Sequence, residues 1–305
     1  MWFKQIQVFQ ITSSVPHSAK VLEEKLGKMI FEPCRANTPF TAGWAAPIDE
    51  DDETLVHAYK DYRLFCLQIE EKMLPSYVIR QELKEKVKHI ELSQQRKISH
   101  KEKYAIKDEI YRTLLPQAFS RISKIYAYFD LANKRLIVNT TNTKRIETFI
   151  SLLQKTIDNI AIISFPIKNL HTIMTNWIQK DNCPKSFCIE DACVLKDPAM
   201  ASKVIRFKGQ DLFSESIQLF LQEGYKVDQI VINWQEQVTL VLKENFTMGT
   251  VKYTEAVVAE IKENASETPE EEFAANFIIM AETLTLLIND LLKICEKKSP
   301  DFDRA

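Results

Sequence analysis

The feature that most constrains the fold is a helical segment, residues 75–116, between two segments with strand-like patterns. Its first half has one apolar helical face, made of Ile79, Leu83, Val87 and Ile90. Ser99 and Glu102 have the spacing of a capping box, which predicts a second helix over about residues 100–115. A helical hairpin of roughly 40 residues is too small to hold a core of its own. We therefore expect an arm that projects from a larger body.

The segments on either side of the arm predict an αβ body. Before the arm, the patterns predict a strand over 2–11, a helix over 18–29, and a strand hairpin over 54–59 and 62–70. After it, they predict strands over 122–129 and 135–139, a helix over 143–157 and a strand over 160–165. The acidic run at 49–53 should be a solvated loop, because adjacent like charges repel. Residues 1–74 and 117–168 should thus form one discontinuous centre domain, with 75–116 inserted.

The remaining residues, 169–305, predict a second αβ domain. The patterns predict strands over 204–211, 227–235, 237–243 and 251–254, and helices over 214–223 and 270–295. Between Glu255 and Glu272 seven acids face one lysine, so this part should point away from any polyanion. The expected fold class is α+β with several domains.

Composition limits the compartment and the cofactors. The chain has 305 residues, is 45% hydrophobic and contains no run of 18 apolar residues, and Met1-Trp2-Phe3-Lys4 begins a short amphipathic run that does not predict a signal peptide. We therefore expect a cytoplasmic protein without a membrane partner. The six cysteines form no CxxC pair, which predicts free thiols. Cys183, Cys188 and Cys193 recur at intervals of five, but a zinc site would need a fourth ligand, so we expect no metal.

Patterns typical of catalysis are few. The five glycines form no phosphate-binding loop, and the five histidines lack metal-ligand spacing. We therefore expect no cofactor and no enzymatic activity. The alternative is a metal-dependent nuclease in which Asp61 and Glu70 hold Mg²⁺ while Lys72 lies beside a scissile phosphate. A charged hairpin that runs into a strand ending at a proline explains the same residues without chemistry.

Positive charge is concentrated in the arm. Residues 78–124 hold twelve Lys or Arg and six Asp or Glu, a local net charge of +6 in a chain of net charge −2. Pairs such as Glu82 with Lys86 could make it a solvated helical hairpin, and an acidic protein could be its partner. Unpaired cations would instead create the field that a phosphate backbone recognises, without sequence preference because no base-reading helix is evident. The candidate DNA-binding residues are Arg80, Lys84, Lys88, Arg96, Lys97, Lys101, Lys103 and Lys107, with Arg121, Lys124 and Lys208 as weaker candidates.

Several long segments resemble one known family. They are MWFKQIQVFQ and GWAAPI near the N-terminus, EEKMLPSYVIRQEL at 70–83, QQRKISHKEKYAIKDEIYRTLLPQAFSR at 94–121, VIRFKGQDL at 204–212, INWQEQVTLVL at 232–242 and FIIMAETLTLLINDLL at 277–292. In this order they resemble the recombination-associated protein RdgC family. The likeness runs nearly from end to end, which makes it far more specific than any one motif.

The resemblance implies a function and a set of sites. RdgC proteins look like ring-shaped homodimers that encircle double-stranded DNA, bind single strands more weakly, and restrain RecA-dependent recombination at the nucleoid. Each half-ring would consist of a centre, an inserted tip and a C-terminal base. By position, Phe119, with Leu114 and Leu115, matches the dimer gate at the tip, and Lys208 and Gln210 match a DNA-facing turn. Gly209 departs from the family pattern, in which a second lysine is expected.

Overall fold

The computed structural model describes residues 1–305 except 49–53, 166, 168, 201, 263–267 and 297–305. The acidic run expected to form a loop lies outside the described residues. The helices are α1 (Ala19–Leu26), α2 (Ser76–Gln94), α3 (His100–Leu114), α4 (Thr143–Thr156), α5 (Leu170–Lys180), α6 (Glu215–Gln222), α7 (Glu255–Lys262) and α8 (Pro269–Glu296), with short 3-10 turns η1 (Gly27–Met29) and η2 (Leu115–Gln117). No described helix is long and apolar enough to cross a membrane.

One antiparallel sheet runs through the whole body. Its strands are β1 (Ile6–Ile11), β2 (Phe40–Ala45), β3 (His57–Tyr59), β4 (Tyr62–Met73), β5 (Phe119–Asp130), β6 (Arg135–Val138), β7 (Ile162–Ser164), β8 (Phe187–Lys196), β9 (Val204–Lys208), β10 (Lys226–Trp234), β11 (Val238–Lys243) and β12 (Thr247–Tyr253). Their order is β2-β4-β5-β6-β1-β12-β11-β10-β8-β9, with β3 paired to β4 and β7 to β1. The mixed α+β class is confirmed. Because β1 pairs with both β6 and β12, the sheet is continuous across residue 168.

Two apolar cores cover opposite faces of the sheet's N-terminal half. On one face α8 packs against Phe3 and Tyr128, and the same core continues under β10 and β11 to Trp234. On the other face α1 and α4 enclose Trp44 and Phe149. The second core ends at α4. Beyond it, no described helix covers this face of the C-terminal strands, and three half-buried valines on it line a shallow cavity of about 280 Å³. We call this surface the open face.

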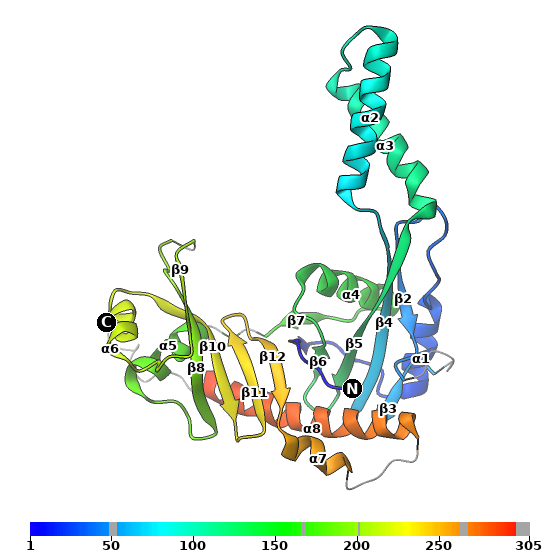
Figure 1. The fold of residues 1–305 in the computed structure, drawn as a ribbon. Coiled ribbons are helices and arrows are strands. Elements are labelled where there is room, and N and C mark those ends of the chain that lie inside the picture. Colours follow the sequence, from blue (N-terminus) through cyan, green and yellow to red (C-terminus); the bar gives the residue numbers. More distant parts are fainter. Residues whose placement is uncertain (49–53, 166, 168, 201, 263–267, 297–305) are drawn as a thin grey trace.

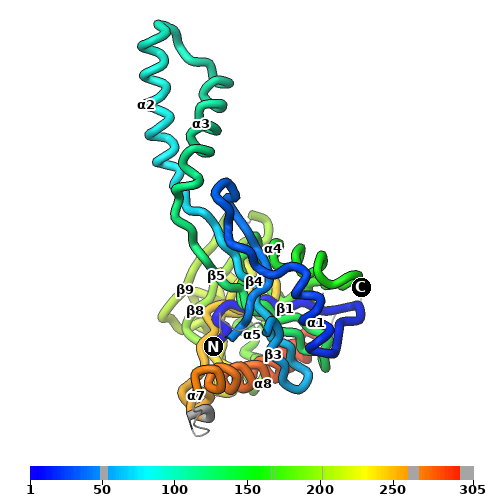
Figure 2. The backbone as a smooth tube through the Cα atoms, turned by 90° about the vertical axis from the view of Figure 1, so that its right-hand side faces the viewer, coloured from blue at the N-terminus to red at the C-terminus, as the bar shows by residue number. Residues whose placement is uncertain are grey.

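The arm is inserted in the chain between two paired strands. β4 and β5 pair from Tyr62 with Asp130 to Met73 with Phe119, and α2 and α3 lie between them in the chain. The two helices pack side by side and project from the body, as two views at right angles show (Figures 1 and 2). The arm and the β8–β9 pair rise from the body on the same side, with α4 between them (Figure 1).

Four elements were missing from the sequence-based expectation: β2, α5, β8 and α7. β2 contains Gly43, where a Cβ would collide with the backbone of Phe31, so the glycine serves a close approach of two segments rather than a turn. β8 is interrupted by a register shift against β10, between the partners of Ile230 and Ile232, and this shift disturbs the alternation of its polar residues. Local pattern was therefore misleading at both strands.

Candidate nucleic-acid interface

The arm is held by a small apolar seam and by well-defined helix ends. Ile79, Ile98 and Ile110 are buried between α2 and α3. The predicted capping box is confirmed, since the Ser99 hydroxyl accepts from the Glu102 N–H at 3.3 Å and the Glu102 carboxylate accepts from the Ser99 N–H at 2.9 Å. The reversal between the helices is therefore fixed at the start of α3 by side-chain bonds to free backbone groups.

The cations of the arm are sorted onto two sides by helical geometry. On α2, Lys86 lies on one flank of the apolar seam, and Arg80, Lys84 and Lys88 lie on the other. On α3, Glu109 lies on one flank, and Lys103 and Lys107 lie on the other. Lys86 Nζ and Glu109 Oε1 form an ion pair at 3.2 Å, which shows that their flanks face the same side of the hairpin. The other two flanks must then share the opposite side.

That opposite side is the basic face of the arm, defined by Arg80, Lys84, Lys88, Lys103 and Lys107. All five side chains belong to exposed residues. Within the part of the chain that the structure describes, no ion pair engages them. Off this face, by contrast, Lys86 pairs with Glu109, and Arg112 pairs with Asp108 at 2.8 Å on the outward side of α3. Within the described chain, the cations of the basic face thus form no ion pair, whereas Lys86 and Arg112 do.

Arg96, at the far end of the arm, is engaged by a carboxylate. Its guanidinium donates to both oxygens of Glu102, at 2.6 and 3.1 Å. This bidentate pair, together with the Ser99 bonds, lowers the pKa of Glu102 to about 2 and raises the pKa of Arg96. A phosphate would have to compete with Glu102 for this guanidinium. Lys97 and Lys101, its neighbours at the same end, are exposed.

The second candidate DNA-facing element is the turn after β9. Lys208 ends the exposed edge strand, and the Gln210 N–H donates to Asp191 O at 3.3 Å. Gly209 lies between them with φ = +69°, a left-handed conformation that glycine adopts without a steric penalty. This conformation explains the departure from the expected lysine, because a lysine there would be strained.

The strand register aligns a polar row on the open face. Reading across the paired strands, the row consists of Arg206, Val194, Gln229, Lys243, Thr247 and Gln7, and all of these except Val194 are polar. Neighbouring strands lie about 4.8 Å apart, so the Arg206 and Lys243 backbones are roughly 14 Å apart. Lys208 lies two residues beyond Arg206 on the same strand and therefore on the same face. The open face thus carries Arg206, Lys208 and Lys243, of which only Lys208 was predicted from the sequence.

The proposed gate residues differ in exposure. Phe119 is 84% exposed at the start of β5, where it pairs with Met73, itself 50% exposed. Leu115 is only 4% exposed and packs inside the root of the arm, and Leu114 is half-buried. An apolar surface is therefore available for a partner at Phe119 and Met73, while Leu115 stabilises the chain's own fold.

Known proteins resemble this chain over nearly its whole length. A family model whose description reads "Putative exonuclease, RdgC" matches residues 1–298. The chain belongs to the RdgC family. A relative from Yersinia enterocolitica, named recombination-associated protein RdgC, is 32% identical over 294 residues, or 96% of this chain and 97% of that protein. Relatives of the same name from Yersinia pestis and Yersinia pseudotuberculosis are 31% identical over the same shares.

The residues of the alternative nuclease site do not come together in this RdgC-family chain. Asp61 lies at the turn before β4 and Glu70 near the far end of that strand, which puts them roughly 30 Å apart. The Glu70 carboxylate accepts from the Cys34 N–H at 2.7 Å, and this bond, with one from Ser120, lowers its pKa. Lys72 Nζ donates to Ala36 O at 2.6 Å and Leu115 O at 3.1 Å. Glu70 and Lys72 therefore fasten the root of the arm, and Asp61 cannot share a metal with them.

Among the residues that the structure describes, no group of His, Cys, Asp or Glu side chains is placed to hold a metal ion. The six cysteines form no disulfide with one another, as expected from their spacing. Burial raises the pKa of Cys183 and of Cys193 to about 12, so neither is a ready thiolate ligand.

The two weaker DNA-binding candidates on β5 lie in different environments. Arg121 is exposed opposite Glu71. Lys124 is half-buried opposite Gln68 and already interacts within the chain. Arg206 was missed, although alternation within 204–208 would have placed it on the face of Lys208. Lys243 was missed because only the pairing of β10, β11 and β12 brings it into the row.

Proposed function

We propose that this RdgC-family protein binds duplex DNA without sequence preference, as a ring-shaped homodimer, and thereby restrains RecA-dependent recombination at the nucleoid. Each half-ring would consist of the centre (1–74 and 117–168), the tip (75–116) and the base (169–305). The observation that supports this most is the basic face of the arm, whose five cations form no ion pair within the described chain, while Lys86 and Arg112, which lie off this face, are paired.

Flexible cations suit recognition of a backbone rather than of bases. Lysine ammonium groups act as point charges, and four of the five residues on the basic face are lysines. Phosphate contacts of this kind supply affinity and position but carry no sequence information. Arg206, Lys208 and Lys243 on the open face would neutralise phosphates on the base side of the same duplex, with Gln210 as a neutral donor.

A dimer would place two basic faces around one duplex. The exposed Phe119 and Met73 are an apolar surface that a second copy can cover, and full burial of one Phe side chain contributes about 1.5 to 3 kcal/mol. A contact of this kind at the tips and another at the bases would close a two-fold ring. The protein would act by occupying duplex, a binding function that needs no catalytic group.

The test is a binding series with labelled linear and closed circular duplexes of unrelated sequences, over a range of salt, with and without Mg²⁺. Three to five phosphates neutralised per subunit predict a slope of log K against log[salt] of roughly −5 to −9. Equal affinity for all sequences, no cleavage, and retention on circles but not on linear DNA at high salt would support the proposal. Mg²⁺-dependent cleavage would favour a nuclease. No binding at low salt would leave an acidic protein as the partner of the arm.

A further inference from the structure

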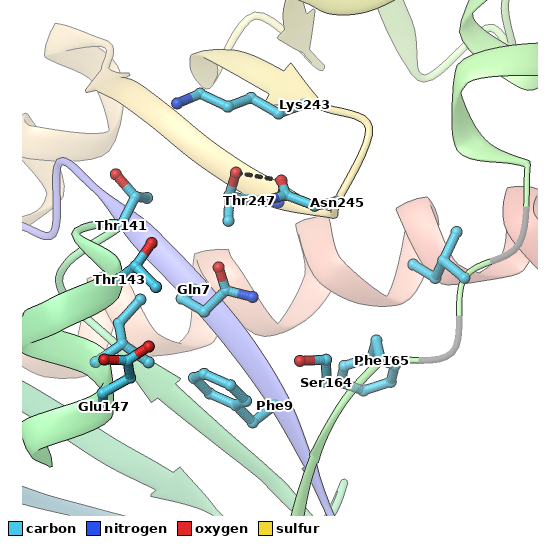
Figure 3. Close-up of a pocket in the computed structure, with 12 residues that line it drawn as sticks. Gln7, Phe9, Thr141, Thr143, Glu147, Ser164, Phe165, Lys243, Asn245 and Thr247 are labelled. Atoms are coloured by element: carbon cyan, nitrogen blue, oxygen red, sulfur yellow. Dashed lines mark hydrogen bonds between the residues drawn. The ribbon is translucent and has the colours of Figure 1, made fainter. Parts of the chain in front are cut away.

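A cavity of about 410 Å³ lies at the end of the polar row, where β1, β7, the start of α4 and the β11–β12 turn meet (Figure 3). Gln7 and Phe9 of β1 form its floor, and Thr143 and Glu147 of α4 form one wall (Figure 3). Phe165 lies on the opposite side, and the Lys243 side chain extends over the top (Figure 3). The cavity belongs to the same face of the sheet as Arg206 and Lys243, because Gln7 is the last member of that row.

Gln7 is the unusual residue of this cavity. It is only 9% exposed, and its side chain amide points into the space (Figure 3). Among the described residues, its amide has no hydrogen-bond partner, whereas two neighbouring hydroxyls are bonded within the chain. The Thr247 hydroxyl donates to Asn245 Oδ1 at 2.6 Å, and the Thr141 hydroxyl donates to Gln5 Oε1 at 2.9 Å. The Gln7 amide is therefore free to bond a molecule in the cavity, which fits a ligand that both donates and accepts hydrogen bonds.

The other walls narrow the ligand class. Phe9 and Phe165 offer apolar ring surface, and Phe165 is supported from behind by Phe246, with ring centroids 5.9 Å apart. The Glu147 carboxylate accepts hydrogen bonds but repels an anion, so a phosphate would not enter beside it. Among the described residues that line the cavity, Lys243 is the only cation, while the Arg135 guanidinium lies 5.9 Å from the centroid of the Phe165 ring. A planar group with a hydrogen-bonding edge, joined to a phosphate outside, matches this arrangement, and the volume lies within the usual range for ligand pockets, about 300–1,000 Å³.

We propose that this cavity binds a single unpaired nucleobase, with the Gln7 amide and the Glu147 carboxylate on the edge of the base and Lys243 on its phosphate. Amide side chains read base edges by donating and accepting together. As an extruded base of a bound strand, the ligand rests on the proposed DNA binding, since the polar row from Arg206 to Lys243 leads the backbone to the cavity. A free mononucleotide has the same chemistry and would reach the cavity without it.

The experiment uses the full chain and a 2-aminopurine reporter. Affinities are measured for a duplex with one bulged 2-aminopurine and for the same duplex with that base paired, and free deoxynucleoside monophosphates are titrated separately by calorimetry. The ratio of the two duplex affinities removes the nonspecific phosphate contribution. We expect the bulged duplex to bind more tightly, and Gln7→Leu to reduce that preference roughly five- to tenfold.

Matched variants keep the proposal open to failure. Gln10→Leu changes the same residue type on the other face of β1 and should leave the preference unchanged. Glu147→Gln, on the exposed side of α4, should reduce the preference even if Gln7→Leu does not fold. Binding of mononucleotides that is sensitive to Gln7→Leu, without a preference for the bulge, would assign the cavity to free nucleotides. Equal ratios for wild type and Gln7→Leu, with no mononucleotide binding, would overturn the proposal. If the protein bound no duplex but still bound mononucleotides, the proposed DNA-binding function would be contradicted instead.

Discussion

At the scale of single residues, the charge that the arm offers is decided by which carboxylates lie beside its cations. Glu102 has two roles, since it closes the capping box and also holds Arg96. Its lowered pKa, about 2, means that the folded arm favours the ionised carboxylate. Its contribution to arm stability is therefore present above the usual glutamate pKa and is lost as the pH falls towards 2. The sequence showed the cap but not the competition for Arg96.

Releasing Arg96 should strengthen DNA binding. Glu102→Gln retains a side chain that can bond to the Ser99 N–H but removes the charge that holds the guanidinium. We expect higher affinity and a salt slope that is steeper by about 0.9 for each additional phosphate that the arm neutralises. The control is Glu109→Gln, which frees Lys86 on the opposite side of the arm. Equal effects of the two variants in a salt titration would contradict the assignment of Arg96 to DNA.

Phe119 should matter for assembly and not for folding. Because its side chain is 84% exposed, Phe119→Ser should leave the melting temperature of the isolated chain unchanged within the small range of surface substitutions. We expect a weaker dimer by sedimentation and faster escape from closed circular DNA. The control is Leu286→Ser, which changes an exposed apolar residue far from the arm, on α8. An unchanged dimer with unchanged retention on circles would remove Phe119 from the gate.

At the scale of elements, the arm is a two-sided object, and its sides can be tested against each other. Lys84→Gln with Lys88→Gln removes two cations from the basic face, and Lys86→Gln with Arg112→Gln removes two cations that already form ion pairs off this face. The first pair should flatten the salt slope by about 0.9 for each phosphate that the variant no longer neutralises, and the second should leave it nearly unchanged. Equal losses of affinity in both double variants would indicate a general attraction without a binding face.

The sequence predicted most elements from local periodicity but could not orient them. The stripe Arg80, Lys84 and Lys88 follows from spacing alone. Only the packing of α2 against α3 places this stripe on the same face as Lys103 and Lys107, and the Lys86–Glu109 ion pair shows how the two helices are oriented. The missing strands β2 and β8 have weak local patterns because neighbours far along the chain determine them.

At the scale of the whole molecule, the continuous sheet and α8 join the centre to the base. α8 is the closing helix of the chain, yet Phe277 packs on Tyr62 and Tyr128, and Met280 accepts a bond from the Phe3 N–H at 3.0 Å. Thr285 likewise donates to Asp130 Oδ2 at 3.2 Å. The proposed division at residue 168 is therefore crossed by strand pairing and by helix packing.

This continuity predicts one cooperative unfolding transition for the body. Two variants, with Trp44 or Trp234 as the sole tryptophan, report on the two cores, and their fluorescence midpoints in urea should coincide. Phe277→Ala, at a fully buried residue, should lower both midpoints together, with a loss of about 3 to 5 kcal/mol in the free energy of unfolding. Leu286→Ser again serves as the exposed control. Two separate midpoints would show that centre and base unfold independently.

The sequence by itself determined the helical arm, its cap, the excess of positive charge and the family, because these depend on neighbours along the chain and on the order of segments. The tertiary structure decided which cations share a face, that Glu102 engages Arg96, that Asp61 lies far from Glu70, and that Gln7 ends a row begun by Arg206. Pairing between distant strands and helices sets these relations, and no local period in the sequence encodes them.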